Sequence, residues 1–205
     1  MNESELKIYL PKFLSAESFN LLLNGLKDFP ENIDSRMYTT FLKGEKNIFQ
    51  GDCLDGLHIV NIETLQKKNV RGIILSNTCD IDPANQRLLP ASIVFAPLIG
   101  LSPYIDILKK GGLSEEKLTS HISSLKRQST THMLYLPSFA DKLEESVVFL
   151  DKIHSIPARM IDLEEIDNQR VVSLSDYGSY MFLFKISMHF TRIQDKVERG
   201  AIKPN

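Results

Sequence analysis

The chain has 205 residues, of which 42% are hydrophobic and 24% are charged, and its formal net charge is −2. This length suits one sizeable domain, and the balance of charge excludes an overall basic surface of the kind that binds nucleic acid, while it leaves room for a local basic patch. No apolar run approaches the roughly 20 residues of a membrane-spanning helix, and the N-terminus M-N-E-S-E-L-K lacks the basic start and apolar core of a signal peptide, so we expect a cytoplasmic protein without a membrane segment.

The first 45 residues predict an extension made of a helix and a strand. Ser15 is a candidate helix N-cap, and Pro30 marks the end of that helix. Between them, four apolar side chains recur at spacings of three and four, as on one face of an amphipathic helix: Phe19, Leu22, Leu23 and Leu26. Residues 37–42, which are aromatic and rich in Thr, predict a strand before a turn at 44–47.

A β pattern follows from residue 48. Residues 57–60 form a short apolar run, and 73–75 (I-I-L) form the central one, in which two of the three side chains are β-branched. Residues 82–86 predict a loop, and 91–96 predict a strand that stops at Pro97. Later β segments are expected at 133–136, 146–150, 159–161 and 170–174.

Helical patterns interrupt and end this β pattern. Residues 103–110 predict a short helix that ends at a Gly-Gly pair, and Ser114 predicts the start of a second helix. A C-terminal helix over 176–199, capped by Ser175 or Asp176, carries one apolar stripe: Phe182, Ile186, Phe190, Ile193 and Val197.

These patterns predict a mainly β protein with appended helices (α+β), built as a small, strongly curved barrel or sheet, because strand and helix do not alternate regularly. We expect a single domain over 1–205. It consists of an N-terminal extension (1–45), a barrel (46–100 and 131–175), a helical insertion (101–130) and a C-terminal helix (176–199).

The order of these pieces resembles the MazF/PemK-like toxin family, an SH3-like barrel whose characterised members cut single-stranded RNA. The resemblance rests on G-D at 51–52, on R-G-I-I-L-S at 71–76, and on I-V-F-A-P at 93–97. It continues with V-V-F-L-D-K-I at 147–153 and with V-S-L-S at 172–175 before the last helix. It implies metal-independent cleavage of RNA by attack of a ribose 2′-hydroxyl, with Arg71 in the place of the family's catalytic arginine.

Arg71 and the polar cluster after the central strand are the first candidate site. A guanidinium donates two parallel hydrogen bonds to a phosphate, so Arg71 is a candidate to stabilise the phosphorane, with Ser76 at the strand end as a candidate acid or base. The alternative is that Arg71 pairs with Asp80 or Asp82 and only braces the loop. Asn77, Thr78 and Asp82 are candidates for substrate binding.

Cys79 and Asp80 allow two interpretations each. Cys79 is a candidate nucleophile with Asp80 and a histidine as partners, or a small apolar residue at a strand end. Asp80 is a candidate acid or base and, with Asp82, a candidate cation ligand, or the two are solvated and form Asx turns. Cys53 and Cys79 form no CxxC and the histidines are scattered, so we expect no metal site and no cofactor.

His189 and Arg192 are three residues apart and therefore share one face of the predicted C-terminal helix. They are candidates for a general acid and a phosphate contact, and the alternative is a partly buried histidine beside a solvated arginine. The lysine pair at 67–68 and the basic stretch at 117–127 are either an RNA-facing edge or ordinary solubilising charge.

Two functions follow as expectations. The first is an RNA-acting endoribonuclease of a bacterial toxin–antitoxin or phage-defence system. The second is a catalytically inactive barrel that serves as an interaction component of a multi-component defence system. The expected partners are single-stranded RNA, an antitoxin or defence-system protein, and a second copy of the chain in a homodimer. A third interpretation is a cysteine-dependent hydrolase centred on Cys79.

Overall fold

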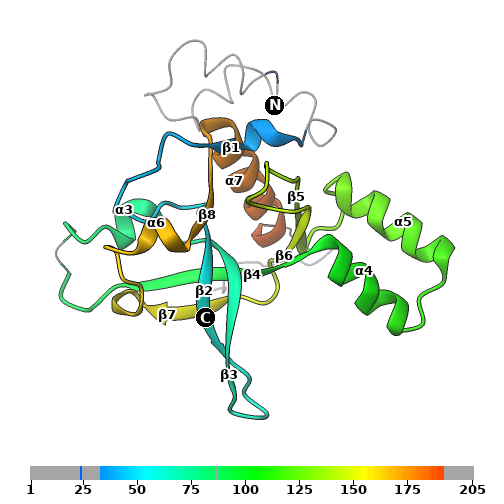
Figure 1. The fold of residues 1–205 in the computed structure, drawn as a ribbon, viewed down its shortest axis with the longest axis horizontal. Coiled ribbons are helices and arrows are strands. Elements are labelled where there is room, and N and C mark those ends of the chain that lie inside the picture. Colours follow the sequence, from blue (N-terminus) through cyan, green and yellow to red (C-terminus); the bar gives the residue numbers. More distant parts are fainter. Residues whose placement is uncertain (1–23, 25–32, 86, 192–205) are drawn as a thin grey trace, which may run out of the picture.

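The computed structural model describes Asn24, residues 33–85 and residues 87–191. This part of the chain has a mixed α+β fold, in which one antiparallel sheet is surrounded by helices (Figure 1). The amphipathic helix expected between Ser15 and Pro30 lies outside the described residues, except for Asn24, which is helical. Arg192 and the last two apolar positions of the C-terminal stripe also lie outside them.

The sheet has eight strands in the order β1-β8-β2-β3-β4-β6-β5, and β7 pairs with β4 beside this path. Every pair is antiparallel. The strands are β1 (Tyr38–Thr39), β2 (Cys53–Val60), β3 (Lys67–Ile74), β4 (Ser92–Gly100), β5 (Met133–Leu136), β6 (Ser146–Phe149), β7 (His154–Pro157) and β8 (Arg170–Leu174).

The two ends of the sheet approach each other without pairing. The hydroxyl of Tyr38 on β1 donates to the carbonyl of Pro137, just after β5, at 2.7 Å, and the Tyr38 ring lies 5.0 Å from that of Phe139. No backbone ladder joins β1 to β5 within the described residues. The sheet is therefore strongly curved and open, and in the described residues its two ends meet through the side chain of Tyr38.

Core side chains fill both faces of the curved sheet. One cluster contains Cys53 and Ile73 and is covered by α7 (Asp176–Phe190) through Met181 and Phe182. We call this side of the sheet the α7 face. The opposite face carries a second cluster that includes Ile74 and the fully buried Phe95. A third cluster packs α4 (Leu101–Lys110) and α5 (Glu115–Lys126) beside β5 and β6.

Local signals predicted several elements correctly. Strands 133–136 and 170–174 form as expected, Ser114 caps α5, and Ser175 caps α7 by accepting from the Gly178 amide. The helix α7 ends at Phe190, with Thr191 at its C-cap, so it is shorter than the continuous helix expected over 176–199.

Other elements differ from expectation. The strand expected over 37–42 is only Tyr38–Thr39, preceded by the 3-10 helix η1 (Ser35–Met37). The strand expected over 159–161 is wrong, because the chain forms the 3-10 helix η2 (Ala158–Met160) there and the strand β7 just before it. Two short helices were not expected, α3 (Thr78–Ile81) and α6 (Ile166–Gln169).

Within the described residues, no helix combines the length and the apolar character that crossing a membrane requires.

Candidate functional site

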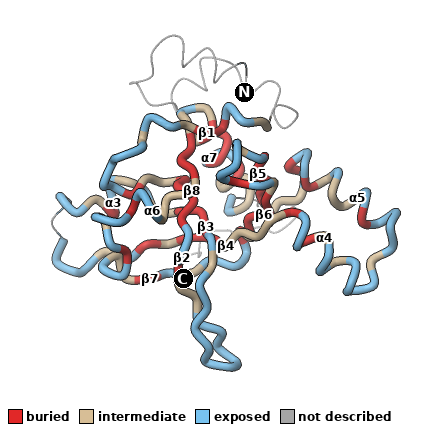
Figure 2. Tube along the Cα trace, in the orientation of Figure 1, coloured by how far each residue is buried: buried red, intermediate tan, exposed pale blue. Residues whose placement is uncertain are grey.

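The β2–β3 hairpin extends from the body of the protein as an arm (Figure 1), and its outer half is solvent-exposed (Figure 2). Side chains alternate between the two faces of a strand. A Cβ on Gly72 would touch Phe95 and Leu57, so Gly72 faces the second core cluster, as does Val70. Arg71 therefore faces the opposite, α7 side, and the same alternation places Asn69 and Lys67 on that side.

Arg71 pairs with Asp55 across the hairpin. Its Nε donates to Asp55 Oδ2 at 3.0 Å, and both side chains are about half exposed. Asp55 reaches this position because β2 has a bulge between Leu54 and Leu57, which contains one extra residue and includes Gly56 at φ +75°. Bulges redirect side chains in this way and are common beside functional sites.

His58 lies on the same face of the arm. It is opposite Asn69 in the strand register, and its Nδ1 lies 2.6 Å from Asn69 Oδ1. With the amide oxygen as acceptor, Nδ1 carries the proton, and Nε2 is left to exchange a proton with a substrate.

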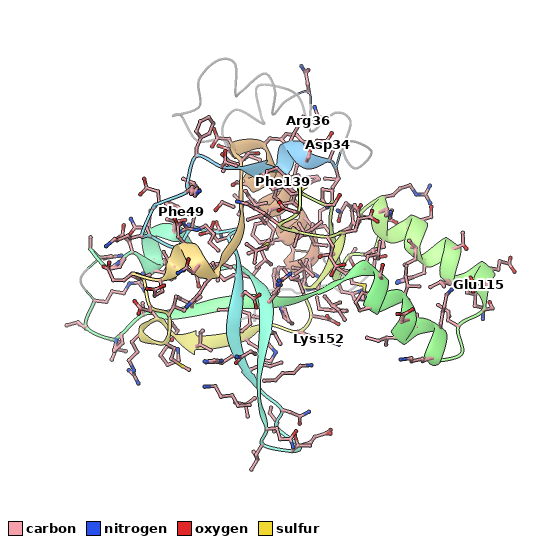
Figure 3. The ribbon with its side chains drawn as sticks, in the orientation of Figure 1. Asp34, Arg36, Phe49, Glu115, Phe139 and Lys152 are labelled. Atoms are coloured by element: carbon pink, nitrogen blue, oxygen red, sulfur yellow. The ribbon has the colours of Figure 1, made fainter. Side chains whose placement is uncertain are left out.

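These residues form one polar surface, which we call the arm stripe: Asp55, His58, Lys67, Asn69 and Arg71. It combines a carboxylate, an imidazole, an amide and two cations on a surface about two strands wide. Figure 3 shows side chains standing on both sides of the arm. Metal-independent cleavage of a phosphodiester needs a base, an acid and a cation beside the phosphate, and the arm stripe contains all three.

The polar cluster after β3 lies elsewhere. Ser76 is five residues along an extended chain from Arg71, which corresponds to about 16 Å. The Ser76 hydroxyl accepts from the Val94 amide at 2.8 Å, and the Thr78 hydroxyl accepts from the Gln50 amide at 2.9 Å. The Asn77 side chain caps α3 by accepting from the Cys79 amide. These side chains therefore hold the turn together.

Cys79, Asp80 and Asp82 have similar local roles. Asp80 pairs with Arg87 at 2.6 Å, and Asp82 accepts from the Ala84 amide in an Asx turn. Cys79 is exposed and its carbonyl accepts from the Asn85 side chain. No histidine bonds to Cys79 within the described part of the chain, and Arg71 pairs with Asp55 rather than with Asp80 or Asp82.

His189 lies near the C-terminus of α7, where its ring makes an edge contact with Phe190 at 4.7 Å. One turn earlier, Lys185 anchors α7 to the carbonyls of Gln128 and Thr130. No hydrogen bond joins His189 to the arm stripe in the described region.

A buried ion pair at the base of the sheet was not expected from the sequence. Asp52 is fully buried and accepts from Arg170 at 3.2 Å and from the Ser173 hydroxyl at 2.6 Å. Burial raises the pKa of the Asp52 carboxyl, against the opposing effect of Ser173, the Phe49 amide and Arg170. Arg170 also donates to the carbonyls of residues 42, 45 and 47. This network holds the 42–47 loop and is structural.

No cluster of three or more His, Cys, Asp or Glu side chains that would suit a metal ion occurs among residues 33–85 and 87–191. No model of a known protein family matches the chain, and no curated protein matches its sequence. The arm stripe is therefore the candidate site on geometry alone. Of the residues singled out in the sequence, it contains Arg71 and one member of the lysine pair.

Proposed function

We propose that this chain acts on RNA as a metal-independent endoribonuclease of a bacterial toxin–antitoxin or phage-defence system, with the arm stripe as its active site. The observation that carries the proposal is the pairing of Arg71 with Asp55, on one face with His58. The exposed position of this pair suits a long, flexible substrate, because an extended strand of RNA reaches it without entering a deep pocket.

Kinship with the MazF/PemK-like barrels is part of the proposal. The strong curvature of the sheet supports it, as does a glycine at φ +89° directly before Asp52 at the entry to β2. The hydroxyl side chain that the family carries after its apolar strand has no counterpart here, because Leu98 and Ile99 follow Pro97. Leu98 is also the register partner of Arg71. We therefore assign the acid and base roles to Asp55 and His58.

In the proposed reaction, Arg71 donates hydrogen bonds to the phosphate oxygens, where negative charge builds as the phosphorane forms. Asp55 accepts the proton of the attacking 2′-hydroxyl. The imidazolium of His58 donates a proton to the leaving 5′-oxygen, and Asn69 orients its ring. The products are a 2′,3′-cyclic phosphate and a free 5′-hydroxyl, so atoms and charge balance.

The test is incubation of the purified protein with mixed single-stranded RNA, with and without EDTA. We expect cleavage that survives EDTA in the parent and disappears in Arg71→Ala and Asp55→Asn. Circular dichroism should show that both variants fold, because both side chains are half exposed. Cleavage by Arg71→Ala at the parent rate contradicts the mechanism.

Neighbouring lysines supply a matched control for RNA binding. Lys67 belongs to the arm stripe, and Lys68 faces the other side of the strand, where its register partner is Ile59. Replacement of one phosphate-contacting lysine costs about 1 kcal/mol, or roughly fivefold in affinity. We expect that loss in Lys67→Ala but not in Lys68→Ala. Equal losses of RNA affinity in the two variants contradict the proposal that RNA binds at the arm stripe.

The second candidate is the catalytically inactive interaction component. It is supported by large apolar side chains that the described fold leaves exposed, among them Phe41 at 94% and Ile62 at 87% of full exposure. It predicts no cleavage by the parent or any variant, and a stable oligomer or a complex with an antitoxin or defence-system protein in light scattering.

A further inference from the structure

The turn over N-T-C-D-I-D at 77–82 does not join the arm stripe, but it forms one wall of a pocket. Ile81 and Asp82 line that pocket directly. Two further contacts of the turn hold the loop at the edge of the pocket in place. Asp80 pairs with Arg87, and the Cys79 carbonyl accepts from the Asn85 side chain. The polar residues of this motif therefore position the pocket wall.

The pocket has a volume of about 420 Å³ and an aliphatic floor. Four isoleucines of the second core cluster form this floor: Ile48, Ile81, Ile93 and Ile161. Each is less than one-tenth exposed, so the packed sheet holds the floor in place. A pocket of this size and character accepts a small molecule with an apolar body.

Two arginines line the pocket, one from the loop after α3 and one from η2. Arg87 is fixed by its bond of 2.6 Å to Asp80. Arg159 on η2 is exposed and makes no ion pair with any residue in the described ranges. An arginine with free donors beside an apolar floor is complementary to a carboxylate or phosphate attached to an apolar body.

We propose that this pocket binds a small amphipathic anion, with its apolar body on the isoleucine floor and its acidic head on Arg159. The pocket belongs to the second core cluster, on the face of the sheet opposite the α7 face on which Arg71 lies. The proposal therefore does not depend on RNA cleavage, and a failure of either leaves the other standing.

The probe is octanoate, with octanol as a ligand of the same chain length but without the charge. The readout is the methyl spectrum of protein labelled at isoleucine methyl groups, with octanoate titrated up to about 10 mM and octanol up to its solubility limit, so that millimolar dissociation constants are measured. We expect shifts at the four floor isoleucines and none at Ile107, which lies on α4 away from the pocket.

Arg159→Gln should weaken octanoate binding about tenfold, the loss of one charge-assisted hydrogen bond, and leave octanol binding unchanged. Arg127→Gln, at the exposed C-cap of α5, is the matched control and should bind octanoate like the parent. Three results overturn the proposal: no shift at the floor methyls, equal binding of octanol and octanoate by the parent, or equal binding of octanoate by the two variants.

Discussion

Lys185 is the buried cation whose behaviour with pH tests the packing of α7. Its side chain has no solvent exposure, and its Nζ donates to the carbonyls of Gln128 at 2.6 Å and Thr130 at 2.8 Å. No carboxylate pairs with it within the described residues. Burial lowers the pKa of Lys185 from 10.5 to about 8, because the charged amine loses its hydration.

The sign of the effect on stability follows from this lowered pKa. Between about pH 8 and pH 10.5 the unfolded chain holds a proton at Lys185 that the folded chain has released, so stability rises with pH in that window. Integration from pH 7 to pH 9.5 gives a gain of about 2 kcal/mol from this one group. Lys185→Met cannot show that gain.

The assay is urea unfolding of parent and Lys185→Met at pH 7 and pH 9.5, followed by circular dichroism. The stability difference between them should grow by about 2 kcal/mol in favour of the parent. Groups present in both proteins cancel, including Cys53, whose burial raises its pKa. Lys110→Met, at an exposed position on α4, is the control. Its free energy of unfolding should change between the two pH values by the same amount as that of the parent. If the free energy of unfolding of Lys185→Met changed with pH as that of the parent does, the lowered pKa of Lys185 would be refuted.

Three further predictions concern the core and the thiols. Gly178→Ala should lower the free energy of unfolding by at least about 2 kcal/mol in urea unfolding, because its Cβ would lie 2.0 Å from a carbonyl oxygen of η1; parent-like stability would contradict this packing. Asp52→Asn should cost about 3 kcal/mol by the same assay, since Arg170 would be left buried without its charge partner; a cost below about 1 kcal/mol would contradict it. In native protein a thiol-alkylating reagent should label Cys79, which is exposed, and spare Cys53, which is fully buried, with both labelled in urea; mass spectrometry checks this, and an unlabelled Cys79 would also dismiss a cysteine-dependent hydrolase.

The elements that the sequence predicted correctly are those with a local signal. Ser114 and Ser175 were correct as helix caps, because a serine side chain satisfies backbone amides within its own first turn whatever the rest of the chain does. The strand β7 was not predicted, because its H-S-I-P carries little apolar alternation and is a strand only through its pairing with β4.

The candidate site also depends on contacts between strands that the sequence does not predict. The polar residues at 76–82 are adjacent in sequence and were predicted as a site, yet they stabilise a turn and a pocket wall. The only sign of the arm stripe in the sequence of β3 is that Lys67, Asn69 and Arg71 occupy alternate positions along this strand. Its other two members come from β2, and no pattern in the sequence pairs them with β3.

The α+β class, the starts of α5 and α7 and the central strands follow from the sequence alone, since they depend on composition, capping and periodicity within a few residues. Which polar groups meet depends on the packing of the whole fold. A bulge in β2 moves Asp55 to Arg71, the strand register places His58 against Asn69, and the curvature of the sheet brings Tyr38 to Pro137. The first two contacts join residues 16 and 11 positions apart across one hairpin, and the third joins residues 99 positions apart, so all three depend on strand register and packing rather than on a pattern within a few residues.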